Sequence, residues 1–309
     1  MILCVTPNPA IDRTLVVSHF ELGGVFRTEE TIMAAGGKGL NVARVAQALG
    51  ADVQCAGFVA GYSGRLFMAL AERDGLSGVW TSIEGETRSC IIVADRSRRD
   101  VSVINERGPQ VTAEDWQRLY DDVTQAAAQA DAICLSGSLP PGATPEGYTA
   151  LLRALRDAGK TVWVDTSGAS LQAALAVEGI RVKVNHEEAG ALVNQRVDGV
   201  RAAIRVAQAI QEHTHDVVVL TLGKAGAVML SDGDCYHARS PEVEAVSSVG
   251  SGDAFLAGLV TGYPTSPETG LAQAVAVGAA NTLMYGGGRF SMDDYHRLLD
   301  ATQVERVAG

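Results

Sequence analysis

The sequence predicts an α/β fold: a mainly parallel sheet covered by helices on both faces, with a small β appendage. Short runs of β-branched residues alternate with longer stretches that keep one apolar face, as strands and helices do when they alternate along a chain. The chain has 309 residues, of which 47% are hydrophobic, so it can bury a large core. Two further regions carry strand-like segments and no helical pattern, and these predict the appendage.

Short apolar runs are expected to form the parallel sheet. Helical stretches fall between several of them. The runs cover residues 2–6, 53–58, 132–135, 161–165, 181–184 and 217–222. In open parallel sheets, ligands bind beyond the carboxyl ends of the strands. We therefore expect the chemistry of this protein in the turns that follow these strands.

Several helices are indicated by their ends or by their composition. Apolar residues within 40–49 keep one face, and Gly50 follows where a left-handed residue would end the helix. Thr112 is placed to cap a helix whose first turn is acidic. The stretch 271–284 is apolar but rich in Ala and Gly and interrupted by polar residues, which predicts a buried helix.

Residues 13–34 and 88–105 break the alternation of strand and helix. Their polar-alternating segments are expected to pair in a small antiparallel sheet that stands off the main one. No linker rich in Pro, Gly or Ser divides the chain, and no internal repeat is present. Residues 1–309 are therefore expected to form a single domain with this appendage.

The composition argues against several classes of function. A formal net charge of -11 repels nucleic acid and anionic membranes, so neither is expected as a partner. The five cysteines are far apart and form no C-x-x-C pair, which favours reduced thiols in a cytoplasmic protein. The N-terminal apolar run is too short for a signal peptide. H-E-x-x-H and G-x-S-x-G motifs are absent from the sequence, which argues against metal hydrolase and serine hydrolase chemistry.

The most informative turn runs from Ser247 to Asp253 and leads into an apolar-periodic stretch. Its glycines let backbone N–H groups converge on an anion, and a helix N-terminus adds partial positive charge. Asp253 would lie in the first turn of the helix, where a carboxylate is favoured and can accept a proton from an attacking hydroxyl. The alternative is an ordinary glycine-rich turn. The segment does not match a Rossmann fingerprint, because Phe255 stands where the third glycine belongs.

A second glycine-rich turn, residues 35–41, also opens a helix and places Lys38 and Asn41 where they could face a ligand. It is not a Walker A loop, because Gly39 follows the lysine where Ser or Thr is required. A flexible surface turn is the alternative. Weaker candidates follow three other strands. These turns are 136–142, 183–188 and 221–227. The alternative for 183–188 is a strand-to-helix cap with an acidic first turn.

Taken together, these turns resemble the two signatures of the PfkB carbohydrate kinase family. Residues 36–41 resemble its N-terminal signature and residues 249–253 its C-terminal one, in the right order and separation. Further segments are similar to the branch that holds 1-phosphofructokinases, tagatose-6-phosphate kinases and minor 6-phosphofructokinases. These segments are 6–12, 105–109 and 136–142. The resemblance implies a ribokinase-like three-layer α/β/α fold, with the two strand-like regions as a small β-sheet lid.

The resemblance also implies a role for particular residues on the acceptor side. Arg88 would bind the phosphate already on the sugar, with help from Arg27 and Lys38. Asp253 would be the catalytic base, next to an anion hole formed by Gly250, Ser251 and Gly252. The remaining residues implied in sugar binding are Asp12, Gly36, Gly37, Asn41 and Ser138.

On the nucleotide side, the resemblance implies that Lys183 reaches the phosphates of ATP. Asn185 and Glu188 match the N-x-x-E element of the family, which organises Mg²⁺ through water. The nucleotide site would be lined by Thr221, Gly223, Gly226, Ser248 and Asn281, with residues 286–288 as a nearby turn. Ser247 and Ser248 replace the usual Asp-Thr pair, which weakens any expectation of a bound monovalent cation.

The expected activity is therefore ATP-dependent phosphorylation of a ketohexose phosphate, with fructose 1-phosphate favoured by analogy. The alternatives are tagatose 6-phosphate or fructose 6-phosphate, then an unphosphorylated sugar or nucleoside. A sugar-phosphate sensor without catalysis is a further alternative, but binding alone needs no base such as Asp253. A homodimer through the lid sheet is also expected, because a small open sheet has edges to cover.

Overall fold

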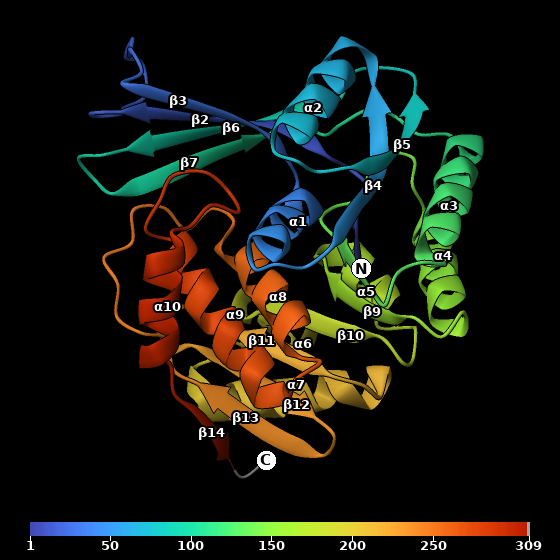
Figure 1. The fold of residues 1–309 in the computed structure, drawn as a ribbon, viewed down its shortest axis with the longest axis vertical. Coiled ribbons are helices and arrows are strands. Elements are labelled where there is room, and N and C mark those ends of the chain that lie inside the picture. Colours follow the sequence, from blue (N-terminus) through green and yellow to red (C-terminus); the bar gives the residue numbers. More distant parts are fainter. Residues whose placement is uncertain (308–309) are drawn as a thin grey trace.

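A computed structural model describes residues 1–307 and contains two β-sheets (Figure 1). The strands of the main sheet are β1 (Ile2–Thr6), β4 (Val53–Ala60), β5 (Gly78–Ile83), β8 (Ala132–Ser136), β9 (Thr161–Asp165), β10 (Arg181–Asn185), β11 (Val218–Thr221), β12 (Ala227–Ser231), β13 (Asp234–Ala238) and β14 (Val304–Val307). They are ordered β14-β13-β12-β11-β10-β9-β8-β1-β4-β5. Seven neighbouring strands of this sheet, β11, β10, β9, β8, β1, β4 and β5, pair in parallel. β12, β13 and β14 add an antiparallel edge next to β11. The expected parallel sheet is therefore confirmed.

Helices cover both faces of this sheet, as side chains of β1 illustrate. Leu3 points to one face, where it joins a core that includes residues of α3, α4, α5, α6 and α7. Cys4 points to the other face and joins residues of α1, α2, α8, α9 and α10. The helices are α1 (Lys38–Ala48), α2 (Gly61–Arg73), α3 (Ala113–Ala127), α4 (Pro145–Asp157), α5 (Gly168–Ala174), α6 (His186–Val193), α7 (Gly199–Thr214), α8 (Ser251–Gly262), α9 (Pro267–Asn281), α10 (Met292–Ala301) and the 3-10 turn η1 (Gly223–Ala225). This is the three-layer arrangement that the sequence predicts.

The helix ends follow the local signals in the sequence. Gly50 has a φ of 92°, the left-handed conformation that ends α1. Thr112 and Asp115 form a reciprocal capping box at the start of α3. The apolar stretch near 271–284 forms most of the buried helix α9. No helix among residues 1–307 has the length and hydropathy that a membrane crossing requires.

The second sheet projects from the main body (Figure 1). Its strands are β2 (Ala10–Val17), β3 (Glu30–Gly36), β6 (Arg88–Asp95) and β7 (Asp100–Asn105), in the order β3-β2-β6-β7. The expected regions do form one small sheet, but the expectation of a purely antiparallel sheet is wrong. β2 and β6 pair in parallel, because the chain between them runs through β3, α1, β4, α2 and β5 and does not form a hairpin.

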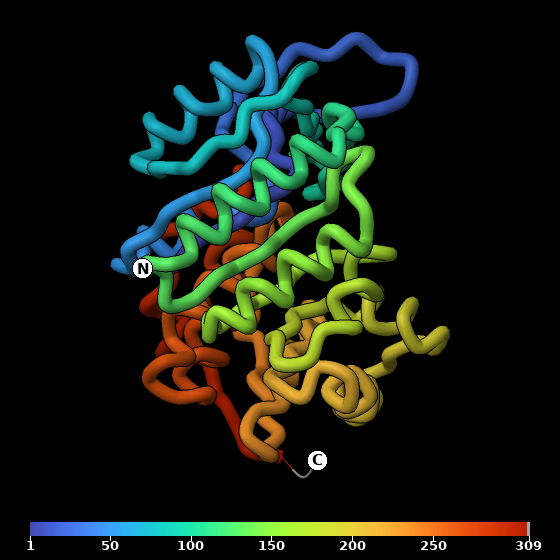
Figure 2. The backbone as a smooth tube through the Cα atoms, turned by 90° about the vertical axis from the view of Figure 1, so that its right-hand side faces the viewer, coloured from blue at the N-terminus to red at the C-terminus, as the bar shows by residue number. Residues whose placement is uncertain are grey.

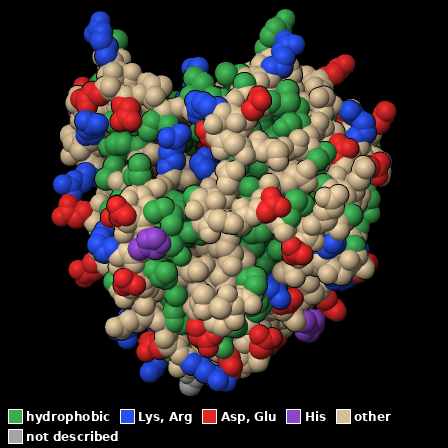
Figure 3. All heavy atoms as spheres, viewed as in Figure 1, with side chains coloured by type: hydrophobic (Ala, Val, Ile, Leu, Met, Phe, Trp, Pro, Cys, Tyr) green, Lys and Arg blue, Asp and Glu red, His purple; other side chains and the backbone are tan. Residues whose placement is uncertain are grey.

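The loop between β2 and β3 contains no strand and stands out from the rest of the chain (Figure 2). On the face seen in Figure 3, acidic and basic side chains are intermixed with apolar ones. The small sheet and the carboxyl ends of the main sheet strands together enclose the space in which the sequence motifs meet.

Candidate active site

A cavity of about 790 Å³ lies between the small sheet and the carboxyl ends of the main sheet strands. Its walls include side chains of β2, β6 and β7, the starts of α1 and α8, and the loop after β8. Of the residues expected at the site, the cavity is lined by Asp12, Gly37, Lys38, Asn41, Arg88, Ser138, Gly250 and Asp253. Segments far apart in the sequence thus converge on one space.

Two residues expected at the substrate do not line this cavity. Arg27 lies in the exposed loop between β2 and β3, and this chain does not bring it to the site. Gly36 acts indirectly, because a Cβ atom at this position would collide with the carboxyl group of Asp12. Gly36 therefore leaves the space that the Asp12 side chain occupies.

Asp253 lies in the first turn of α8. This helix begins directly after Gly250, whose φ of 81° is in the left-handed region that favours glycine. Its carboxylate accepts a hydrogen bond from Nδ2 of Asn41 at 2.8 Å. Burial raises the pKa of Asp253 to about 6, although Lys38 and the Asn41 hydrogen bond act in the opposite direction. The group is therefore a carboxylate at neutral pH and a stronger base than an exposed aspartate.

The backbone at the start of α8 offers free donors beside this carboxylate. The N–H of Ala254 donates to the carbonyl of Gly250. Within residues 1–307, the N–H groups of Gly252 and Asp253 donate to no protein acceptor. Ser251 differs from the expected pattern, because its N–H donates to the carbonyl of Ser248 at 3.2 Å. The open amides at this helix N-terminus suit an anion, so residues 250–253 form a candidate anion cradle.

An ion-pair triad with a buried carboxylate at its centre lies next to the anion cradle, and sequence reasoning missed this carboxylate. Asp165 ends β9 and is fully buried, and its two carboxylate oxygens accept hydrogen bonds from Lys38 at 2.8 Å and Lys183 at 2.9 Å. Burial alone would raise the pKa of Asp165, but the two ammonium groups outweigh it and lower the pKa. The position of Asp165 at the carboxyl end of a predicted strand was a signal that could have identified it.

The same triad brings Lys183 to the anion cradle. A Cβ atom on Gly252 would lie 2.9 Å from Nζ of Lys183, so the ammonium group lies against the first turn of α8. Burial by itself lowers the pKa of Lys38, but the carboxylates of Asp165, Asp253 and Glu188 outweigh it and raise the pKa. Lys38 is therefore charged, and it lines the cavity that also holds Asp253.

Arg88 is held in the cavity wall by backbone carbonyls. Its guanidinium donates to the Asn8 carbonyl from Nε and Nη2, and to the Glu106 carbonyl from Nη1. Two of the five N–H groups of an arginine are then left for a ligand. Asn8 also donates from Nδ2 to Oγ of Ser138 at 3.4 Å, which joins the loop after β8 to this wall.

Asp12 faces the same space from β2. Burial raises its pKa to about 6, against the opposing effects of Arg44 and Arg88. Asp12 and Asp253 are therefore two buried carboxylates that share one cavity, and each has cationic groups nearby.

The residues expected at the nucleotide lie along the neighbouring strand ends. Asn185 and Thr221 are register partners at the ends of β10 and β11. Asn185 also caps α6, and the Glu188 side chain accepts a hydrogen bond from the Asn185 N–H at 3.0 Å. The strand-to-helix cap expected as an alternative for this turn is therefore present.

Other residues expected at the nucleotide have contacts inside the protein. Gly226 follows η1, and a Cβ atom there would collide with the carbonyl of Ala238. Asn281 is fully buried and donates from Nδ2 to the carbonyl of Arg289 at 2.6 Å. Asn281 thus holds the 286–288 turn in place. Gly223 begins η1, on the same rim as Thr221.

Within residues 1–307, no three His, Cys, Asp or Glu side chains are arranged to hold a metal ion by themselves. A metal ion at Glu188 would need further ligands from water or from nucleotide phosphates, as Mg²⁺ sites in kinases commonly have.

A family model described as pfkB family carbohydrate kinase matches residues 5–294. A 1-phosphofructokinase from Haloferax volcanii is 33% identical over 283 residues, covering 90% of this chain and 87% of the relative. A tagatose-6-phosphate kinase from Staphylococcus epidermidis is 29% identical over 313 residues, covering 99% of this chain and all of the relative (100%).

Solved structures agree with this result. Phosphofructokinase-2 from Escherichia coli, in complex with substrates and products, has a TM-score of 0.88 at 26% identity. The match covers 97% of this chain and 98% of that one. The tetrameric inhibited form of the same enzyme has a TM-score of 0.88 at 27% identity, with the same coverage of 97% and 98%. The ribokinase-like fold implied by the motifs is confirmed.

Proposed function

This chain belongs to the PfkB family of carbohydrate kinases, and we propose that it transfers the γ-phosphoryl group of ATP to fructose 1-phosphate, giving fructose 1,6-bisphosphate. That it is a sugar-phosphate kinase follows from relatives named 1-phosphofructokinase and tagatose-6-phosphate kinase. Fructose 1-phosphate is favoured because relatives named 1-phosphofructokinase, from Haloferax volcanii and Escherichia coli, are 33% and 32% identical to this chain. Tagatose 6-phosphate is the alternative, supported by a relative 29% identical over 99% of this chain.

The single observation that carries the mechanism is a carboxylate beside open backbone amides. Asp253 would take the proton of the sugar hydroxyl as that oxygen attacks phosphorus, a contribution of roughly 10²–10⁴ in rate. The N–H groups of Gly252 and Asp253 would hold the γ-phosphoryl oxygens as the bond to ADP breaks. Phosphoryl transfer needs this kind of positioning and charge stabilisation more than covalent chemistry.

The cavity wall opposite Asp253 suits a second phosphate. Arg88 has N–H groups to spare and lines the cavity, and a guanidinium fork matches a phosphate. We therefore assign the phosphate already on the sugar to Arg88. The sugar hydroxyls between the bound phosphate and the attacking hydroxyl would then donate to Asp12 and accept from Asn41.

The nucleotide would lie over the ends of β10 and β11. Lys183, against the first turn of α8, would contact its phosphates, and Glu188 would orient Mg²⁺ through water. When bound, Mg²⁺ neutralises phosphate charge. Lys183 and Lys38, which bind the two carboxylate oxygens of Asp165, would both contact the transferred phosphoryl group.

The small sheet is proposed to act as a lid and as a dimer interface. Its outer loop and β7 expose large apolar side chains, which a second copy could cover. The exposed side chains are Leu22 (95%), Val25 (93%), Val103 (44%) and Ile104 (62%). Arg27 belongs to the same loop and does not reach the cavity of its own chain. Its expected contact with the substrate phosphate would therefore require the cavity of a second copy.

The activity is tested by one coupled ADP assay with five acceptors. Fructose 1-phosphate, fructose 6-phosphate, tagatose 6-phosphate, ribose and adenosine would be compared by kcat/KM. The proposal expects fructose 1-phosphate to be used best. A higher value for another acceptor would replace the proposed substrate, and binding of a sugar phosphate without ADP formation would favour the sensor.

A further inference from the structure

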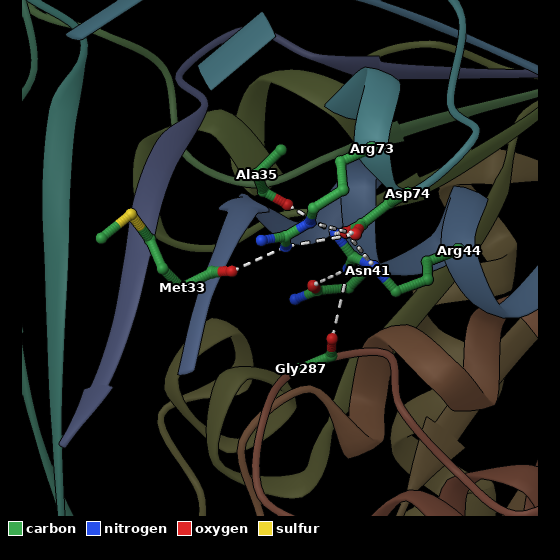
Figure 4. A network of polar contacts seen from close by, with 7 residues as sticks. All are labelled: Met33, Ala35, Asn41, Arg44, Arg73, Asp74 and Gly287. Atoms are coloured by element: carbon green, nitrogen blue, oxygen red, sulfur yellow. Dashed lines mark hydrogen bonds and ion pairs between the residues drawn. The ribbon is translucent and has the colours of Figure 1, made fainter. Parts of the chain in front are cut away.

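Arg44, on α1, is a mostly buried arginine that sequence motifs did not single out. Its side chain is 11% exposed, and each of its five N–H groups has an acceptor (Figure 4). Nε and Nη2 donate to Asp74 at 3.1 and 3.0 Å, and Nη2 also donates to the Ala35 carbonyl at 2.7 Å. Nη1 donates to Oδ1 of Asn41 at 3.1 Å and to the Gly287 carbonyl at 3.2 Å.

These bonds determine which way the Asn41 amide faces. Asn41 and Arg44 are three residues apart on one helix, so their side chains share a face. Oδ1 of Asn41 accepts from Arg44, while Nδ2 donates to Asp253 at 2.8 Å. A flipped amide would place its oxygen against the carboxylate and its N–H₂ against the guanidinium. Arg44 and Asp253 together therefore allow one orientation.

Arg44 also supports the anion cradle through the glycine turn at 286–288. A Cβ atom on Gly287 would lie 2.7 Å from Nδ2 of Asn41, so the turn packs directly on that amide. A Cβ atom on Gly250 would lie 2.6 Å from Cα of Gly287, so the same turn packs on the start of the cradle. The bond from Arg44 to the Gly287 carbonyl fixes this turn against both.

A neighbouring arginine provides a comparison within the same network. Arg73 donates to Asp74 and, at 2.8 Å, to the Met33 carbonyl of β3. Like Arg44, it therefore ties the edge strand of the lid sheet to the end of α2. Figure 4 shows Arg73 on the lid side of Asp74, and Arg44 between Asp74 and Asn41. Arg73 anchors the lid strand and makes no bond to Asn41.

We propose that Arg44 is a positioning residue for phosphoryl transfer: it orients the Asn41 amide toward Asp253 and holds the Gly287 turn against the anion cradle. The role rests on the proposed function of Asp253 as the base. Arg44 touches no reacting atom in this scheme. Its removal would displace the base and the cradle by a small distance, and displacements of about 1 Å can cost roughly 10²-fold in rate.

The test compares Arg44→Lys, Arg44→Met and the control Arg73→Met in the full-length protein with ATP and Mg²⁺. The acceptor is whichever of the five sugars and nucleosides the wild type uses fastest. A wrong substrate would then overturn the proposed acceptor and leave this comparison intact. We expect both Arg44 variants to lower kcat by about 10–10²-fold. Arg73→Met should keep kcat within about 3-fold of wild type, because it leaves the Asn41 bonds in place.

A pH profile separates positioning from general loss of structure. The buried carboxylate of Asp12 is faced by Arg44 from α1, Arg88 and Cys90 from β6, and Asp253 from α8. Arg44→Met removes one of the two cations, Arg44 and Arg88, that face Asp12. The pKa of Asp12 should therefore rise, and the acid limb of kcat/KM for the sugar should move to higher pH. Arg44→Lys keeps the charge and should leave the limb in place while kcat stays low.

Two outcomes would overturn the proposal. One is a folded Arg44→Lys protein, judged by an unchanged unfolding midpoint, whose kcat lies within about 3-fold of wild type. The other is an equal loss of kcat in Arg44→Lys and Arg73→Met, which would assign the effect to the lid anchor. If Arg44→Met fails to fold because Asp74 loses one of its two arginine partners, Arg44→Lys decides the result, since it keeps a cation at that position beside Asp74.

Discussion

The Asn41 amide donates to the Asp253 carboxylate at 2.8 Å, although 212 residues separate the two in the sequence. This contact joins the starts of α1 and α8, the two helices that follow the glycine-rich turns. It places the candidate base at the edge of a cavity that also holds Arg88 and Lys38. In the proposed reaction, the sugar and the nucleotide phosphates would meet at this pair.

Asp253→Asn should lower kcat by at least about 10²-fold while KM for the sugar and for ATP changes little. The substitution keeps the shape of the side chain and removes its ability to take a proton. Steady-state kinetics on the preferred acceptor measure this effect. A kcat close to wild type would remove Asp253 as the base.

Arg88→Ala should mainly raise KM for the sugar phosphate. The guanidinium has two N–H groups free of backbone carbonyls and faces the cavity. KM for ATP serves as the internal control, because Arg88 lies on the lid strand β6, away from the ends of β10 and β11. An unchanged KM for the sugar phosphate would remove Arg88 from the phosphate site.

The activity should fall as pH drops through about 6, the value to which burial raises the pKa of Asp253. Below that value the carboxylate holds a proton and cannot accept another from the hydroxyl. A raised carboxyl pKa in the folded state also means that this group stabilises the fold at low pH. That contribution is lost as pH rises from the ordinary value of 3.8 to about 6. A kcat profile from pH 5 to 8 checks the first statement, and unfolding midpoints measured from below pH 3.8 to above pH 6 check the second.

Asp165→Asn should lower the free energy of unfolding by about 3–5 kcal/mol, because it leaves the buried ammonium group of Lys183 and the partly exposed one of Lys38 without their carboxylate. Adding Lys38→Met should recover part of the loss, since one of the uncompensated charges is then removed. Urea unfolding of the two single variants and the double variant measures the coupling. Additive losses would show that Asp165 and Lys38 do not act as a pair.

Substrate binding should protect the lid strands from hydrogen exchange. The proposal that the small sheet closes over the sugar predicts slower exchange in β2, β3, β6 and β7 when the preferred acceptor is present. Strand β14, at the far edge of the main sheet, is the control and should not change. Equal exchange with and without acceptor would remove the lid role.

The sequence by itself determined the parts of this protein that depend on neighbouring residues. Strand runs, the capping box at Thr112 and the left-handed turn at Gly50 are set by contacts within a few residues. The glycine turns before Lys38 and Asp253 were likewise recognisable, together with the chemistry that those side chains suit.

Only the tertiary structure decided which of these groups meet. Asp165 binds Lys38 across 127 residues, and Arg44 contacts Gly287 across 243. Both contacts depend on how strands and helices pack. The parallel pairing of β2 with β6 was also decided at this level, because the crossover through the main sheet sets strand direction. Local sequence signals carry no information on such distant partners. Hydrogen bonds and charges act strongly in the low-dielectric interior, so these partners decide the charge state and the orientation of the side chains in the site.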